Sequence, residues 1–228
     1  MTNRVSSLGA IPMADLKADA RRLQMINGQL RTSDVNEIEI LSAFAAVPRE
    51  RFVARGQEAL AYADGEVAAS GPKGRKLLSP RTLGLLLKCA SPAAGELALV
   101  VGGGSGYAAA LLAALGLDVV ALETDAAAAR TATAGAARIE HAQGELTSPP
   151  AGKGPFDVIL LNGAFEVAPE ALIAALSEGG RLVGVDARFG AKRIVVFERS
   201  GGGISERAFY DAAADVLPGF FRAPEFAF

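Results

Sequence analysis

A glycine-rich turn near the middle of the chain restricts the possible folds more than any other feature. The run Gly102-Gly103-Gly104-Ser105-Gly106 follows a short apolar stretch at 96–101 and leads into an Ala- and Leu-rich stretch at 105–115. A buried strand that ends in glycines and continues into a helix binds nucleotide-like ligands in open α/β sheets. The turn therefore predicts an α/β fold with a ligand site at the carboxyl end of this strand.

The rest of the chain continues this alternation of strand and helix. We expect buried strands at 96–101, 118–122, 137–142, 156–161 and 181–185, with helices at 105–115, 125–137 and 169–176. Such alternation indicates a parallel sheet covered on both faces. Two further strands, 192–199 and 204–210, flank Ser200-Gly201-Gly202-Gly203, which predicts a hairpin and hence an antiparallel edge.

The first 80 residues have a different character. We expect helices at 15–29 and 34–46, the second capped by Ser33 or Asp34, and then a Gly-rich loop at 56–74. Pro80 is expected to start another helix that ends near Cys89. The prediction is an N-terminal helical extension, 1–80, joined to a core, 81–228, in one compact unit.

Composition narrows the functional classes. The 228 residues suit one large domain. A net charge of −2 argues against a dedicated nucleic-acid binder, and the single cysteine excludes a disulfide framework within the chain. No apolar run suggests a transmembrane segment or a leader peptide, so we expect a cytoplasmic protein. A peripheral place on a larger assembly stays open.

The glycine turn also indicates which ligand it holds. Gly102 permits the sharp turn, Gly104 lets the backbone approach the ligand, and Gly106 allows close packing at the helix start. Glu123 ends the next strand, where a carboxylate can accept hydrogen bonds from both ribose hydroxyls. Position 107 is tyrosine, whereas a dinucleotide fingerprint has glycine there. This spacing favours S-adenosylmethionine over NAD.

Two more residues are candidates for the cofactor site. Glu145 follows the third core strand, where it is either an adenine-binding residue or a solvated loop acid. Asn162 follows the fourth strand, at the carboxyl edge of the sheet where ligands bind.

Several motifs together resemble the protein-L-isoaspartate O-methyltransferase family, over about residues 20 to 220. They are Gln29-Leu30-Arg31, Val47-Pro48-Arg49-Glu50-Arg51-Phe52-Val53, Ala61-Tyr62-Ala63-Asp64, Ser105-Gly106-Tyr107 and Glu178-Gly179-Gly180-Arg181-Leu182-Val183. The resemblance implies a class I S-adenosylmethionine-dependent methyltransferase fold, Rossmann-like, with a mostly parallel seven-stranded sheet. It also implies protein repair by methyl transfer to the isoaspartyl carboxylate of a protein or peptide substrate.

The chain departs from the family pattern at two positions. Leu78 stands where family members carry a substrate-contacting serine, so no catalytic residue is assigned. Val100 replaces the usual acid two residues before the first glycine, which predicts weakened or lost cofactor binding. Three hypotheses therefore remain: an isoaspartyl methyltransferase, a methyltransferase with another acceptor, and a catalytically inactive accessory or structural subunit of a larger complex.

The remaining reactive or unusual residues give weaker indications of function. His141 is the only histidine and has no metal-ligand spacing around it, so no metal site is expected. Cys89 is expected to be a buried, inert thiol. Arg75, Lys76 and Arg81 form either a solvated basic turn or an anion-binding cluster. The Phe-rich end, 218–228, either packs over the sheet or docks another protein.

Overall fold

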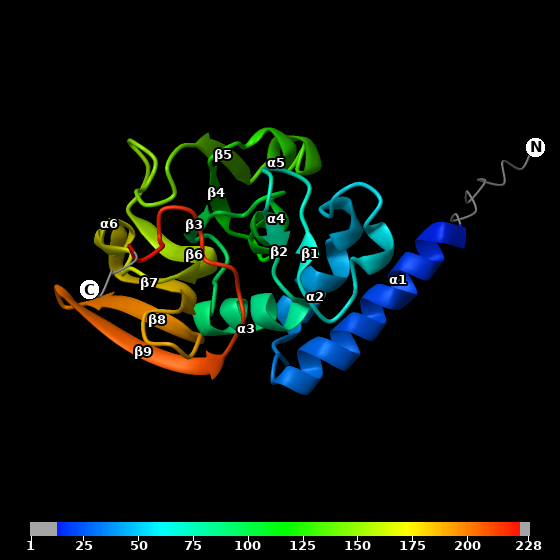
Figure 1. The fold of residues 1–228 in the computed structure, drawn as a ribbon, viewed down its shortest axis with the longest axis horizontal. Helices are drawn as coiled ribbons and strands as arrows, with labels where there is room; N and C mark the ends of the chain where they lie inside the picture. The colour runs from blue at the N-terminus through cyan, green and yellow to red at the C-terminus, as the bar shows by residue number, and fades with distance from the viewer. Residues whose placement is uncertain (1–12, 224–228) are drawn as a thin grey trace, which may run out of the picture.

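A seven-stranded sheet forms the centre of the computed structural model, which describes residues 13–223 (Figure 1). The strand order is β5-β4-β3-β6-β7-β8-β9. Strands β3 to β7 run parallel to one another, β8 pairs antiparallel with β7, and β9 pairs antiparallel with β8. The bounds are β3 Leu97–Val101, β4 Asp118–Glu123, β5 Ile139–Gln143, β6 Phe156–Phe165, β7 Leu176–Asp186, β8 Arg193–Ser200 and β9 Gly203–Asp211. The predicted fold class is confirmed.

Helices cover both faces of this sheet because its central strands are apolar on both sides. On one face, residues such as Val100 and Leu160 pack with the helices of the N-terminal half. On the other, residues such as Leu99 and Ile159 pack with a short C-terminal helix. The helices are α1 Met13–Met25, α2 Ile38–Ala46, α3 Pro80–Ala90, α4 Tyr107–Ala114, α5 Ala127–Ala132 and α6 Glu170–Ala174.

Short elements link the N-terminal helices to the core. A π-helical turn, η1 Ile26–Leu30, is followed by the 3-10 turns η2 Arg31–Ser33, η3 Arg49–Arg51 and η4 Glu58–Leu60. The hairpin β1–β2 pairs Val67–Ala68 with Lys76–Leu77. Met25 and Phe44 belong to the same buried cluster as Val100 of the sheet. The division at residue 80 stays a prediction.

Several predicted helix ends were wrong. Helix α2 begins at Ile38, and neither Ser33 nor Asp34 caps it. Asp34 instead adopts a left-handed conformation, and its carboxylate binds Lys88 and Tyr210. Helix α5 ends at Ala132, before Gly135 at φ +85°. The predicted 169–176 helix is shortened to α6 because Leu176 already starts β7, and the expected 56–74 loop contains β1.

A buried arginine ties two of the N-terminal loops together. Arg49 is fully buried, and it donates to the carbonyls of Ala61 and Leu78, each at 2.7 Å. Its guanidinium carbon lies 5.1 Å from the ring centroid of Tyr107. Burial lowers the pKa of Arg49. The side chain thereby fixes the loop that leads into α3.

The chain after β9 returns across the sheet. Residues 212–220, which we call the C-terminal segment, run past α3 to the carboxyl ends of β3 and β6 (Figure 1, orange to red). Val216 forms a parallel bridge with Ala164 of β6, and Phe220 is buried. Phe220 thus packs over the sheet, Phe221 is exposed, and Phe226 and Phe228 lie outside the described residues. None of the helices within 13–223 has the length and apolar character to cross a membrane.

Candidate functional site

The glycine turn lies where β3 ends and α4 begins. Gly102, Gly104 and Gly106 have φ angles of +71°, +59° and +89°. L-residues with a Cβ rarely adopt such angles, so the turn requires glycine at these three positions. The helix α4 starts directly after Gly106. The structure therefore brings the predicted turn to the carboxyl edge of the parallel sheet.

Glu123 reaches this turn from the end of the neighbouring strand β4. Its side chain is only 3% exposed. The backbone N–H of Gly104 donates to Oε2 at 3.0 Å, and that of Thr124 donates to Oε1 at 2.8 Å. The acid expected to bind ribose thus lies against the turn, as its place at the end of β4 predicts.

A basic residue occupies the remaining side of this carboxylate. Arg75, from the β1–β2 hairpin, donates from Nη2 to Oε1 of Glu123 at 2.7 Å and from Nε to Oε2 at 3.1 Å. This bidentate pair is largely shielded from water, with the Arg75 side chain 10% exposed. Together with the backbone donors it uses both carboxylate oxygens.

The structure gives the other two predicted basic residues separate partners. Lys76 pairs with Glu66 and Asp215, and Arg81 donates to the carbonyl of Asp211. The role of Arg75 could not be predicted from the sequence, because 48 residues separate it from Glu123 and no local pattern joins them.

A small hollow lies next to Arg75. The hollow lined by Arg75, Asn162 and Leu217, among others, has a volume of about 50 Å³. Small-molecule sites usually measure about 300–1,000 Å³. This hollow alone is therefore smaller than a usual cofactor site, whereas the backbone turn and the acid suit an adenosine ligand.

The other predicted positions differ in how deeply they are buried. Asn162 is buried and donates from Nδ2 to the carbonyl of Gly102 at 3.2 Å. Glu145 is exposed on the loop after β5. Val100 is buried in the core beneath the turn, and Leu78 is buried with its carbonyl bound to Arg49. Leu78 therefore presents neither a hydroxyl nor a free carbonyl to a substrate.

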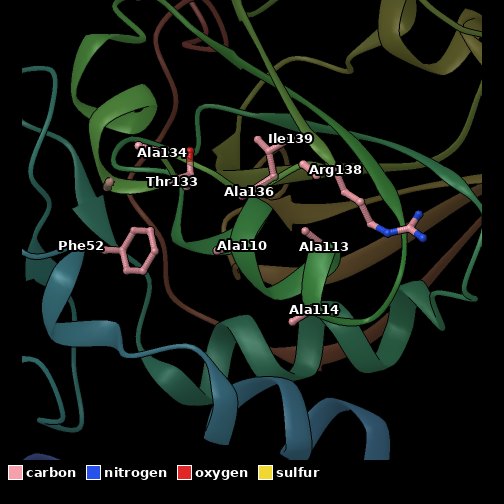
Figure 2. Close-up of a pocket in the computed structure, with 11 residues that line it drawn as sticks. Phe52, Ala110, Ala113, Ala114, Thr133, Ala134, Ala136, Arg138 and Ile139 are labelled. Atoms are coloured by element: carbon pink, nitrogen blue, oxygen red, sulfur yellow. The ribbon is translucent and has the colours of Figure 1, made fainter. Parts of the chain in front are cut away.

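A larger hollow lies elsewhere, beside α4 (Figure 2). Its volume is about 380 Å³, and alanines of α4 and of the segment before β5 form most of its wall. Arg138 is its one charged residue, and its guanidinium extends away from the alanines and pairs with Asp118 at 3.0 Å. With no carboxylate or histidine among its lining residues, it offers no catalytic group.

The remaining reactive residues have local partners. Nε2 of His141 lies 2.7 Å from the hydroxyl of Thr133, and burial lowers the pKa of the imidazole. Burial raises the pKa of the half-buried Cys89 thiol to about 11. Within residues 13–223, no three His, Cys, Asp or Glu side chains are grouped to hold a metal ion.

Comparison with known proteins places the chain among the methyltransferases. Residues 21–209 match the family model described as Protein-L-isoaspartate(D-aspartate) O-methyltransferase. The chain belongs to this family. A protein-L-isoaspartate O-methyltransferase of Methylorubrum populi is 38% identical over 171 residues, covering 72% of this chain and 79% of the relative. One of Koribacter versatilis is 36% identical over 167 residues, covering 71% and 74%.

Solved structures of the family share the fold. A Plasmodium falciparum protein assigned as a protein-L-isoaspartate O-methyltransferase, in complex with S-adenosyl-L-homocysteine, superposes with a TM-score of 0.73. It is 18% identical, and the match covers 86% of this chain and 97% of that one. Another protein-L-isoaspartate O-methyltransferase matches with a TM-score of 0.76 at 20% identity, covering 87% of this chain and 66% of the other.

Proposed function

We propose that this chain is a cytoplasmic protein carboxyl methyltransferase, which transfers a methyl group from S-adenosylmethionine to the isoaspartyl carboxylate of a protein or peptide. Membership of the family supports this function. The observation that carries it is the placement of Glu123: a buried acid at the end of β4, hydrogen-bonded to the backbone of the glycine turn. We assign Gly102, Gly104, Gly106, Glu123, Glu145 and Asn162 to the cofactor site.

Methyl transfer to a carboxylate requires little acid–base catalysis from the protein. A carboxylate is already a nucleophile, so the reaction depends on orientation more than on a general base. Lys76 is the partly exposed cation at the rim of the site, where its Nζ pairs with Asp215 at 2.7 Å. It is the residue that we assign to attract an anionic substrate. With Leu78 in the place of the family serine, orientation would rest on charge and on the backbone.

A second function is supported by one specific observation. Leu217 packs against Gly102 and Arg75 pairs with Glu123, so two residues that we assign to the cofactor site contact side chains of the chain itself. An accessory subunit of a larger complex would need the fold alone. A methyltransferase with a different acceptor would retain cofactor binding and lack activity on isoaspartyl peptides.

The test is transfer of radiolabelled methyl from S-adenosylmethionine to a peptide with one isoaspartyl residue. The same peptide with normal aspartate is the matched control. We expect base-labile label on the isoaspartyl peptide only. Cofactor binding without such transfer would support another acceptor, whereas absence of both would support the accessory role.

A further inference from the structure

The side chain of Leu217 occupies a notch beside Gly102, a residue that we assign to the cofactor site. Gly102 of the turn and Gly163 of β6 form this glycine notch. A Cβ built on either glycine would lie 2.7 Å from the Leu217 side chain, well inside van der Waals contact. Leu146 closes the next position, 3.5 Å from a Cβ built on Gly102. The space that the missing side chains leave at these two glycines is therefore filled by Leu217.

Backbone hydrogen bonds hold Leu217 in this position. The N–H of Leu217 donates to the carbonyl of Ala164 at 2.9 Å, and the N–H of Ala164 donates to the carbonyl of Asp215 at 2.8 Å. Glu166 donates to the carbonyl of Phe220 at 2.8 Å. The C-terminal segment thus lies along the end of β6 like a short extra strand.

The segment forms the outermost layer of the structure at this edge. From 212 to 220 only every third side chain is buried, namely Ala214, Leu217 and Phe220. Its ion pair, between Lys76 and Asp215, is exposed, with side chains 45% and 63% accessible. Besides the three anchors and the backbone bonds, Lys192 donates from Nζ to the carbonyl of Ala214 at 2.7 Å, and the hydroxyl of Thr82 donates to the carbonyl of Ala213 at 3.4 Å. Such a weakly covered segment is the kind of element that opens locally while the rest of a protein stays folded.

We propose that the C-terminal segment is an intramolecular plug, and that S-adenosylmethionine enters only when Leu217 leaves the glycine notch. This inference rests on the proposed function. When only a fraction of molecules is open, the apparent dissociation constant rises in inverse proportion to that fraction. Changes that release the plug should therefore tighten binding, although they add no contact to the ligand.

The experiment is calorimetric titration of the full chain with S-adenosylhomocysteine, the unreactive product. Leu217→Ala empties the notch, and Asp215→Asn removes the exposed ion pair without altering the notch. Phe221→Ala is the matched control, because this neighbouring side chain is 60% exposed. We expect Leu217→Ala to bind at least about ten-fold tighter than the unmodified chain, Asp215→Asn to bind more tightly by a smaller factor, and Phe221→Ala to be unchanged.

Hydrogen exchange provides a second measurement. A bound ligand usually protects amides around its site, whereas displacement of the plug should raise exchange at 212–220 in the unmodified chain. Equal affinities for all forms, with exchange unchanged or lowered, would overturn the plug and leave the proposed function intact. A gain in affinity without faster exchange would also overturn a moving segment. Absence of binding by every form at millimolar ligand would overturn both proposals.

Discussion

Replacement of Arg49 by methionine tests whether this buried arginine stabilises or destabilises the fold. Arg49 is completely buried and bonded to two carbonyls, and one of its nitrogens, Nη1, has no hydrogen-bond partner. Methionine keeps most of the apolar stem. The substitution thus removes the charge and the two donors, with little change in volume.

Two terms of opposite sign decide the result. The carbonyls of Ala61 and Leu78 lose their donors, and each unsatisfied buried acceptor costs about 1–3 kcal/mol. Removal of a buried charge, whose pKa is already lowered by burial, offsets part of this loss. We expect a net destabilisation of about 2 kcal/mol, because both bonds are short and both carbonyls belong to buried residues.

The assay is thermal and urea unfolding, with Arg51→Met as the matched control. Arg51 belongs to the same 3-10 turn and is exposed, so its replacement should change stability by less than about 0.5 kcal/mol. For a chain of this length, Arg49→Met should lower Tm by roughly 4–8 °C. An Arg49→Met variant as stable as the unmodified chain would refute the reasoning, since charge burial would then outweigh the two hydrogen bonds.

Three further outcomes are expected. Glu123→Gln leaves Arg75 buried without its counter-charge and should cost about 3 kcal/mol in urea unfolding; addition of Arg75→Met should recover part of this, and full additivity would contradict the pairing. The N–H of Leu97 and the hydroxyl of Ser177 hold the pKa of the Asp157 carboxyl below its ordinary value of 3.8. The ionised Asp157 carboxylate therefore stabilises the fold above about pH 4, and this stabilisation is lost as pH falls through the lowered pKa. The difference in unfolding free energy between the unmodified chain and Asp157→Asn should shrink in acid. A difference that stays constant with pH would contradict this role of Asp157. With its pKa raised to about 11, Cys89 should react with a thiol reagent far more slowly at pH 8 than it does in denaturant, and equal rates would exclude the burial of the thiol.

Local pattern was sufficient for the architecture. Each of these elements has a pattern within its own segment: the apolar runs of β3 and β6, the glycines of the turn after β3, and the hairpin glycines at 201–203. Glu123 was found for the same reason, because a residue at the end of β4 must lie beside a turn at the end of β3. These inferences need only the periods of strand and helix and the geometry of a parallel sheet.

Contacts between distant segments could not be predicted in this way. Nothing in the sequence near Arg75 marks it as the partner of Glu123, and Leu217 is one leucine among many. The error at α2 has the same origin. Asp34 has the sequence context of a helix cap, but Lys88 and Tyr210, from other elements, bind its carboxylate. Tertiary partners overrode the local preference in each case.

The ion pair between Arg75 and Glu123 has a consequence for how the binding of cofactor and of acceptor are coupled. Arg75 belongs to the hairpin that also carries Lys76, the residue assigned to the acceptor substrate. A ribose that takes the Glu123 carboxylate would release Arg75, and with it one anchor of the hairpin. Linkage is reciprocal, so an acceptor that favours the released hairpin would strengthen cofactor binding to the same degree. Cofactor and acceptor would then bind cooperatively, whichever of them binds first.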